Sequence, residues 1–248
     1  MRLDKYLVFE GYFESRNRAL EAIKSAQVTV DGHSAKPSTH IGENTLVEVA
    51  DAKYYVSRAA RKLEGFLSKY PLELEDKRAL DVGSSTGGFT QILLERRIAH
   101  VDCVDVGRDQ LHTSLRNDPR VGVHEQTDIR DFYTDTPYEV IVSDVSFISL
   151  LHILDAIDRL SAKGAQIVLL FKPQFEVGRE ASRDRRGVVT DEGAIQRAMD
   201  AFELATAKLG WQRLQKTPSQ YRGREGNQEW VYLFRRVGAD SISALGAQ

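Results

Sequence analysis

The residues best suited to ligand chemistry form a glycine-rich loop at the end of a short apolar run. The loop reads Asp81-Val82-Gly83-Ser84-Ser85-Thr86-Gly87-Gly88-Phe89-Thr90. Glycines let a backbone turn sharply and let a ligand approach closely. The N-terminus of the helix that we expect after the loop offers N–H groups without partners inside the helix. This segment therefore predicts a cofactor site.

Three classes of cofactor are bound by loops of this kind, and the residue types discriminate among them. A phosphate-binding P-loop needs a lysine directly after the second glycine of its spacing, where this chain has Phe89. A dinucleotide loop needs glycine at the third position of its pattern, where this chain has Ser85. The remaining pattern, Asp-x-Gly-x-x-x-Gly-Gly, resembles the first motif of class I methyltransferases. That resemblance implies S-adenosylmethionine as the cofactor.

Carboxylates follow the next two predicted strands. Asp105 ends the second strand, where an acid can accept hydrogen bonds from both hydroxyls of an adenosine ribose. Asp128 follows the third strand and could accept from an adenine amino group. Single acids at such places often only cap helices, but these stand in register with a glycine loop. The predicted cofactor-binding residues are Asp81, Gly83, Ser84, Ser85, Thr86, Gly87, Gly88, Phe89, Thr90, Asp105, Val106, Gly107, Gln110, Asp128, Ile129 and Asp144.

Two lysines and two carboxylates could act on a hydroxyl group. Asp144 and Lys172 follow the fourth and fifth predicted strands, Glu229 lies at the last one, and Lys62 lies on a helix before the sheet. A ribose 2′-hydroxyl is a poor nucleophile that needs a base and in-line alignment with a methyl donor. A lysine serves as a base only when its amine is partly neutral, which burial and a second cation favour. We hypothesise that Lys172 is the general base, that Asp144 orients it, and that Lys62 and Glu229 position the ribose. Any one of these residues alone is better explained as an ordinary salt-bridge partner, whereas four of them at motif-like positions favour catalysis.

The elements that must position these residues form an alternating pattern. The predicted strands are 78–82, 100–105, 121–124, 138–143, 165–171, 211–216 and 229–235, and the predicted helices include 88–97, 149–161 and 190–209. Alternation of this kind predicts an α/β fold, a doubly wound and mostly parallel sheet with helices on both faces. Ligands bind such sheets at the carboxyl ends of the strands.

Residues before this region follow another pattern. Two short helices and a hairpin, with strands near Val28–Val30 and Leu46–Val49, predict a small α+β binding module. We expect this module at 1–52, a linker at 53–57, the large domain at 58–238 and a flexible tail at 239–248.

Composition narrows the function classes. The chain has 248 residues, a net charge of −2 and one cysteine, so global basicity does not indicate a nucleic-acid partner and a multi-cysteine zinc site is excluded. We predict no metal site. The charged N-terminus and the lack of an apolar run of about 18 residues favour a soluble, cytoplasmic protein without membrane association.

Several motifs together resemble the TlyA/hemolysin A family. The matching segments are Asp81–Thr90, Asp105–Leu111, Asp118–Val121, Ser143–Leu150, Phe171–Glu176 and, in the first module, Arg2-Leu3-Asp4, Ser15-Arg16, Val28–Gly32 and Lys36–Ser38. This family joins an S4-like RNA-binding domain to an FtsJ-like class I, Rossmann-like methyltransferase with a seven-stranded, mostly parallel sheet. Membership implies 2′-O-methylation of ribosomal RNA, typically at cytidines of the 16S or 23S molecule, by a tetrad that maps to Lys62, Asp144, Lys172 and Glu229.

Local basic residues agree with an RNA partner, either ribosomal RNA or ribosomal subunits. The arginines predicted to contact phosphates are Arg2, Arg16, Arg18, Arg58, Arg61, Arg185 and Arg186. For Arg185 and Arg186 a solvated loop explains the charges equally well. Phosphate contacts position a protein without reading sequence. Three alternatives stay open at this point: a non-catalytic RNA-binding or ribosome assembly factor, a membrane-active hemolysin, and a methyltransferase of small molecules. The oligomeric state is not indicated.

Overall fold

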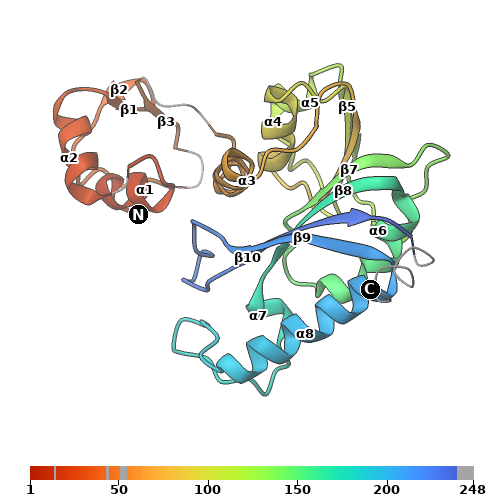
Figure 1. The fold of residues 1–248 in the computed structure, drawn as a ribbon. Coiled ribbons are helices and arrows are strands. Elements are labelled where there is room, and N and C mark those ends of the chain that lie inside the picture. The colour runs from red at the N-terminus through yellow and green to blue at the C-terminus, as the bar shows by residue number, and fades with distance from the viewer. Residues whose placement is uncertain (14, 43–44, 51–54, 239–248) are drawn as a thin grey trace.

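The two sequence patterns fold as two lobes in the computed structural model, which describes residues 1–13, 15–42, 45–50 and 55–238. The small N-terminal lobe lies beside helix α3 (Arg58–Lys69), away from the large sheet (Figure 1). Residues 53 and 54 of the predicted linker and the predicted tail at 239–248 lie outside the described residues.

The N-terminal lobe packs two helices against a small antiparallel sheet. Its elements are α1 (Leu3–Phe9), α2 (Arg16–Lys24), β1 (Val28–Val30), β2 (His33–Ser34) and β3 (Val47–Val49), with β1 in the centre of the sheet. The hydroxyl of Ser15 accepts from the backbone N–H of Arg18 at 3.4 Å and caps α2, as its residue type favours. Gly11 has φ +75°, which allows the sharp turn after α1.

The large lobe is built on a seven-stranded sheet. Its strands are β4 (Arg78–Val82), β5 (His100–Val104), β6 (Val121–His124), β7 (Tyr138–Ser143), β8 (Ser161–Phe171), β9 (Trp211–Pro218) and β10 (Trp230–Arg236). They lie in the order β6-β5-β4-β7-β8-β10-β9. The first five strands are parallel, and β10 runs antiparallel to both β8 and β9.

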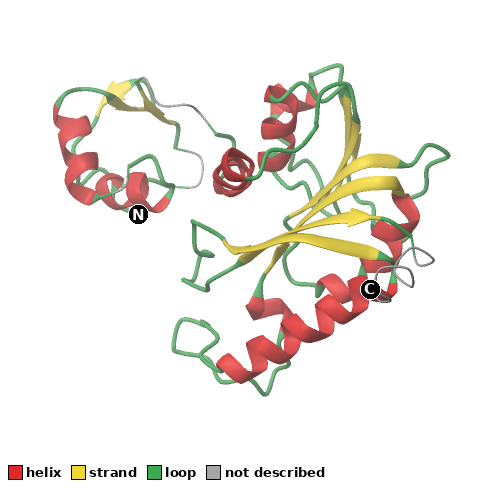
Figure 2. Ribbon diagram, in the orientation of Figure 1, coloured by secondary structure: helices red, strands yellow, loops and turns green. Residues whose placement is uncertain are grey.

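Helices cover both faces of this sheet (Figure 2). One face packs against α3, α4 (Gly88–Glu95) and α5 (Thr113–Arg116). The other packs against the 3₁₀ turn η1 (Leu150–His152), α6 (Leu154–Leu160) and α8 (Glu192–Lys208), while the short α7 (Pro173–Glu176) follows β8. Neighbouring strand residues alternate between these cores; Ala79 faces the first and Leu80 the second. Burial on both faces explains the nearly continuous apolar strands.

The strand order places the functional loops. The chain winds outward from β4 to β6 on one side and continues from β7 on the other, so the order reverses between β4 and β7. A crevice opens at such a switch point, outside the carboxyl ends of the strands. The glycine loop after β4 and Asp144 after β7 therefore meet there.

The predicted α/β class with a seven-stranded, mostly parallel sheet is confirmed. The predicted helix at 149–161 is wrong as a single element, because η1 and α6 are separate and Ser161 already pairs with Tyr138 at the start of β8. β8 consequently begins four residues earlier than the predicted 165. No helix in the described part of the chain is long and apolar enough to cross a membrane.

Candidate active site

The loop after β4 has the backbone geometry that its glycines suggested. Gly83 and Gly87 adopt φ +72° and +90°. A Cβ atom on Gly83 would lie 2.7 Å from the side chain of Val145, and one on Gly87 would lie 2.4 Å from Leu115. Other residues would therefore strain the backbone and collide with neighbours at both positions.

Asp81, near the end of β4, supports this loop through hydrogen bonds from Thr90. Its Oδ2 atom accepts from the backbone N–H of Thr90 at 3.0 Å and from the Thr90 hydroxyl at 2.6 Å, which ties the end of β4 to the first turn of α4. The side chain is almost completely buried, and this burial raises its pKa to about 7. The hydrogen bonds from Thr90 oppose the shift because they stabilise the charged form.

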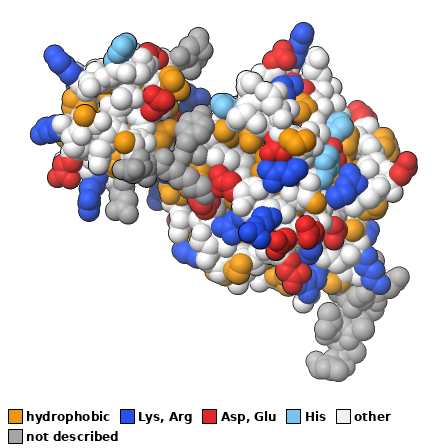
Figure 3. All heavy atoms as spheres, turned by 90° about the horizontal axis from the view of Figure 1, so that it is seen from above, with side chains coloured by type: hydrophobic (Ala, Val, Ile, Leu, Met, Phe, Trp, Pro, Cys, Tyr) orange, Lys and Arg blue, Asp and Glu red, His pale blue; other side chains and the backbone are white. Residues whose placement is uncertain are grey.

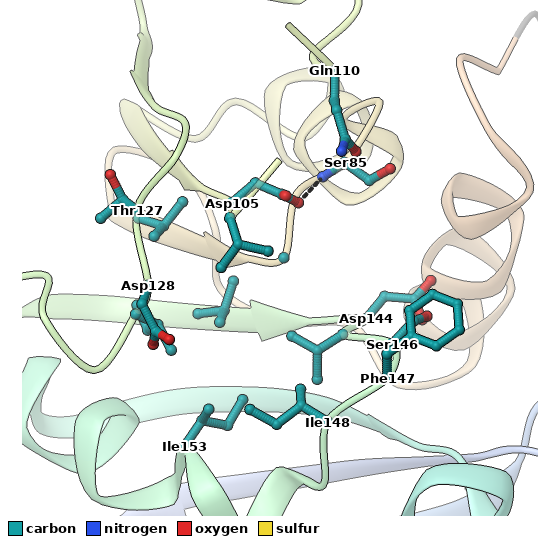
Figure 4. Close-up of a pocket in the computed structure, with 16 residues that line it drawn as sticks. Ser85, Asp105, Gln110, Thr127, Asp128, Asp144, Ser146, Phe147, Ile148 and Ile153 are labelled. Atoms are coloured by element: carbon teal, nitrogen blue, oxygen red, sulfur yellow. Dashed lines mark hydrogen bonds between the residues drawn. The ribbon is translucent and has the colours of Figure 1, made fainter. Parts of the chain in front are cut away.

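Asp105 joins the glycine loop to the loop after β5. One carboxylate oxygen accepts from the backbone N–H of Ser85 at 2.8 Å (Figure 4). The other accepts from the backbone N–H of Gly107 at 2.7 Å. A carboxylate has about four acceptor positions, so it can still accept hydroxyl groups from a ligand.

Glu125, which directly follows β6, holds the same region. Its carboxylate accepts the backbone N–H groups of Asp109, Gln110 and Leu111 at 2.7–3.1 Å and pairs with Arg116 at 2.5 Å. These donors, with Arg116 contributing most, lower its pKa to about 2. The carboxylate of Glu125 is therefore ionised at neutral pH and holds the loop that carries Gln110 in place.

A cavity of about 340 Å³ lies among these loops. Its volume is in the usual range of about 300–1,000 Å³ for small-molecule sites. It is lined by Val82, Gly83, Ser85, Val104, Asp105, Val106, Gln110, Thr127, Asp128, Ile129, Asp144, Val145, Ser146, Phe147, Ile148 and Ile153. Asp128 and Phe147 lie at opposite ends of it, with Asp105 between them (Figure 4). Apolar walls with a few carboxylates suit a flat aromatic base joined to a ribose.

The predicted cofactor residues divide into three groups. Those on the cavity wall are Gly83, Ser85, Asp105, Val106, Gln110, Asp128, Ile129 and Asp144. Those that line only an adjoining larger cleft are Asp81, Ser84, Thr86 and Phe89. Gly87, Gly88, Gly107 and Thr90 line neither space. The last group shapes the loop: a Cβ on Gly88 would collide with Ser57 at 2.1 Å, and Thr90 is fully buried against Asp81.

The four predicted catalytic residues come together as a chain of alternating charges. Lys172 Nζ lies 2.6 Å from Asp144 Oδ1, an ion pair that lacks hydrogen-bond angles. Lys62 Nζ lies 3.9 Å from Asp144 Oδ2 and 2.7 Å from Glu229 Oε2. The two lysine side chains are each 8% exposed, Asp144 14% and Glu229 2%. Buried charges are retained at such cost only when they are paired, as these are.

Further contacts fix both ends of this row of four charged side chains. Lys172 Nζ also donates to the backbone oxygen of Asp144 at 3.1 Å and to Ser146 Oγ at 2.8 Å. At the other end, the amide of Gln174 donates to Glu229 Oε1 at 3.5 Å. A Cβ on Gly223 would lie 2.6 Å from the same oxygen, so glycine leaves room for Glu229.

The tetrad opens into a larger cleft of about 970 Å³. Both lobes line this cleft, since Tyr6, Phe9 and Glu10 stand opposite Lys62 and Lys172. The cofactor-sized cavity and the cleft share wall residues, among them Asp144 and Phe147. A small ligand and a larger one can therefore approach each other beside Asp144.

Two of the predicted RNA-contacting arginines brace the lobes against each other. The guanidinium of Arg58 lies 4.4 Å from the centre of the Phe9 ring and donates to the backbone oxygen of Arg222 at 2.9 Å. Arg61 donates to the backbone oxygen of Gly11 at 2.5 Å and stacks on the rings of Tyr12 and Tyr55. Burial lowers the pKa of Arg61.

The other predicted arginines are more exposed. Arg2 and Arg16 both pair with the fully buried Asp4, at 3.0 and 2.5 Å, and their side chains are 44% and 54% exposed. Arg18, Arg185 and Arg186 also lie on the surface, and Arg186 pairs with Asp184. Lys and Arg side chains project around the edge of the N-terminal lobe (Figure 3).

Sequence reasoning assigned no role to several residues that shape the site. Ser146 and Phe147 lay inside a recognised motif, yet nothing in the pattern indicated that one holds Lys172 and the other lines both spaces. Gln174 and the buried Asn227 were likewise not assigned. Asn227 accepts from Val189 N at 2.9 Å and so ties the 183–189 loop to the segment before β10. Among the described residues, no group of three or more His, Cys, Asp or Glu side chains is arranged to hold a metal ion.

Comparisons with known proteins agree with this architecture. The FtsJ-like methyltransferase family model matches residues 55–236, and the S4 domain model matches residues 1–47. A 23S rRNA (cytidine-2′-O)-methyltransferase TlyA from Campylobacter jejuni is 42% identical, over 94% of this chain and 99% of its own length. A 16S/23S rRNA (cytidine-2′-O)-methyltransferase TlyA from Mycobacterium tuberculosis is 40% identical, over 100% of this chain and 94% of its own.

A solved structure shares both the fold and part of the sequence of this chain. A provisionally assigned hemolysin from Streptococcus thermophilus superposes with a TM-score of 0.76 at 33% identity, covering 95% of this chain and 88% of that one.

Proposed function

The chain belongs to the TlyA/hemolysin A family of FtsJ-like methyltransferases, and from this premise we propose that it transfers a methyl group from S-adenosylmethionine to the 2′-hydroxyl of a cytidine in 16S or 23S ribosomal RNA. The observation that carries the proposal is the buried chain Lys172–Asp144–Lys62–Glu229, which lies where the small cavity meets the large cleft.

The residues of the small cavity fit the proposed cofactor. Asp105 would hold the ribose hydroxyls, Asp128 would accept from the adenine amino group, and Ile129 and Ile153 would cover the base. The glycine loop at Gly83 leaves room for the amino-acid end. S-adenosylmethionine supplies an electrophilic methyl group.

The tetrad residues act on the ribose that receives the methyl group. Lys172, as the general base, takes the proton of the 2′-hydroxyl at Nζ. Asp144 stabilises the ammonium group that results, across the observed 2.6 Å. Lys62, held by Glu229 at 2.7 Å, donates to the ribose oxygen and keeps it oriented.

The N-terminal lobe and the surface arginines bind the RNA. We assign residues 1–52 to the S4-like domain and 58–238 to the methyltransferase domain, which matches the change in sequence pattern. Arg2, Arg16, Arg18, Arg185 and Arg186 contact phosphates, whereas Arg58 and Arg61 hold the two lobes together beside the cleft. A nucleotide within a duplex is turned outward to reach the tetrad, which costs a few kcal/mol.

Methyl transfer by variants of full-length protein tests the proposal. Labelled S-adenosylmethionine and ribosomal subunits are incubated with wild type, Lys172→Ala and Lys163→Ala; Lys163 lies on the same strand but is exposed. We expect Lys172→Ala to lose about 10²- to 10⁴-fold in transfer rate, the range of general-base catalysis, with cofactor affinity nearly unchanged. Lys163→Ala should behave as wild type. A Lys172→Ala rate above a tenth of the wild-type rate refutes the base assignment.

A further inference from the structure

The loop that joins β7 to η1, residues 144–149, forms a wall shared by the cavity and the cleft. It carries Asp144 at one end and Ser149 at the other. Between them, Phe147 adopts φ +66° and is 91% exposed. This left-handed backbone is unfavourable for a residue with a bulky side chain, so neighbouring contacts must hold the loop in shape.

Those contacts come from one short segment, residues 172–176. Lys172 holds the beginning of the loop through the backbone oxygen of Asp144 and the hydroxyl of Ser146, at 3.1 and 2.8 Å. The ring of Phe175 packs on Phe147, with 5.2 Å between the ring centres.

Glu176 holds the other end of the loop. Its Oε2 atom accepts from Ser149 Oγ at 2.6 Å, and its Oε1 atom accepts from the backbone N–H of Leu150 at 2.9 Å. Hydrogen bonds to an ionised acceptor are about twice as strong as neutral ones. Both bonds are formed where η1 begins, and the second one satisfies a backbone N–H that lacks a partner within the turn.

We propose that Glu176 is a positioning residue that clamps the 144–149 loop and thereby sets both cofactor affinity and the alignment of Asp144 with Lys172. This inference rests on the proposed function, since it assigns the loop to a cofactor wall and a catalytic centre. Glu176 acts only through the loop, as the lining of neither space includes it. Val145, Ser146, Phe147 and Ile148 would lose their fixed positions on the cavity wall without it.

The test replaces Glu176 by its amide and compares a matched control. Glu176→Gln keeps the shape of the side chain but removes its charge. The control is Asp158→Asn, because Asp158 also accepts hydrogen bonds from two residues, from Trp211 Nε1 at 2.8 Å and from Arg236 Nε and Nη2 at 2.7 and 3.0 Å. Asp158 lies near the amino end of β8, away from the candidate site at its carboxyl end. Its partner Arg236 directly follows Arg235, which pairs with Gln166 early in β8.

Cofactor binding is measured by titrating S-adenosylmethionine into each full-length variant. We expect Glu176→Gln to raise the dissociation constant about tenfold, the loss of roughly one hydrogen bond to a charged group, and to lower kcat as well. Asp158→Asn should keep the wild-type dissociation constant and kcat even if its thermal stability falls. A Glu176→Gln constant within about twofold of wild type, well below that expected loss, overturns the proposal.

Ser149→Ala offers a second test, because it removes the same contact from the other partner. The effects of Ser149→Ala and Glu176→Gln on the dissociation constant should be less than additive when combined, as expected for residues in direct contact. Fully additive effects overturn the clamp.

The two proposals fail in different ways. Unchanged cofactor affinity in Glu176→Gln, together with loss of transfer in Lys172→Ala, rejects the clamp and leaves the proposed function standing. Wild-type protein that binds the cofactor but methylates no RNA rejects the proposed function, whereas the binding measurements still decide the clamp.

Discussion

Carboxylates hold pairs of basic residues in two regions of this protein, the tetrad of the large lobe and the Asp4 cluster of the N-terminal lobe. In the tetrad, Asp144 stands between two lysines that are each 8% exposed. In the cluster, Asp4 stands between Arg2 and Arg16, whose side chains are 44% and 54% exposed. In both regions one carboxylate pairs with two cations, but the exposed fraction of the cation side chains differs severalfold.

This difference suggests different uses of the same arrangement. A buried lysine is poorly solvated, so its charge depends on its neighbours and it can exchange a proton with a substrate. An exposed arginine keeps its charge and its fork of donors, which suits phosphate binding. We therefore expect the carboxylate to support proton transfer in the tetrad and to hold surface cations in place in the Asp4 cluster.

The largest effect that we predict comes from removing the shared carboxylate of the tetrad. Asp144→Asn leaves Lys172 without its counter-ion and should reduce methyl transfer by about 10²- to 10⁴-fold, the scale of a proton-transfer contribution. Single-turnover transfer to ribosomal subunits measures this. Glu225→Gln, an exposed carboxylate on the same cleft, is the control and should retain full activity. Equal rates for the two variants would mean that the carboxylate of Asp144 matters no more for methyl transfer than the exposed carboxylate of Glu225.

Asp81 sharpens the comparison because it lies near the tetrad and accepts its hydrogen bonds from Thr90, a neutral residue. Its folded-state pKa of about 7 exceeds the ordinary 3.8, so the native protein binds a proton that the unfolded chain has released in this range. The contribution of Asp81 to stability should therefore be fully present below about pH 4 and be lost as pH rises to about 7, a change of a few kcal/mol. Urea unfolding across this range measures the change.

Asp81→Asn is the matching variant, since an amide does not titrate. It should remove this part of the pH dependence and leave the remaining slope unchanged. A wild-type slope that persists in Asp81→Asn would show that another group is responsible.

Asp4 should have a smaller effect of opposite sign with pH. Hydrogen bonds from Arg2 and Arg16 hold its pKa at about 2, below the ordinary 3.8. Its contribution to stability is present above pH 4 and lost as pH falls toward 2. Asp4→Asn should destabilise the N-terminal lobe by about 1.5–3 kcal/mol at neutral pH, the usual value of hydrogen bonds to a charged group. Amide hydrogen exchange, resolved by lobe, locates the loss, and an equal loss in the large lobe would contradict it.

The smallest predicted effects separate two kinds of arginine. Arg16→Ala should lower the slope of log Kd against log salt for RNA binding by about 1, as for one lost phosphate contact. Arg61→Ala should leave that slope unchanged, because the Arg61 guanidinium is occupied by Gly11, Tyr12 and Tyr55. Filter binding of ribosomal RNA at several salt concentrations measures both. Equal losses of slope would mean that burial does not distinguish the two sites.

Much of this arrangement could be predicted from the sequence. Strand ends are marked by local patterns, so Asp105, Asp144 and Lys172 could be placed at one edge of the sheet before any contact was known. The glycine loop was also readable, because its residue types exclude the other cofactor loops at Phe89 and Ser85.

The rest depends on contacts between distant parts of the chain. The sequence does not show that Thr90 and Gly88 stay off the cavity wall, since that depends on their contacts with Asp81 and Ser57. Arg58 and Arg61 read as a basic strip, and only the position of the N-terminal lobe beside α3 reveals their contacts with Phe9 and Gly11. The pairing of Glu176 with Ser149 spans 27 residues and leaves no periodic pattern.

The most direct test of the central claim is the chemical identity of the methylated product. Purified protein is incubated with isotopically labelled S-adenosylmethionine and ribosomal RNA, and the RNA is digested to nucleosides for mass spectrometry. The proposed use of the tetrad predicts label in 2′-O-methylcytidine. Label confined to a methylated base, or RNA without label while the protein binds the cofactor, would contradict it.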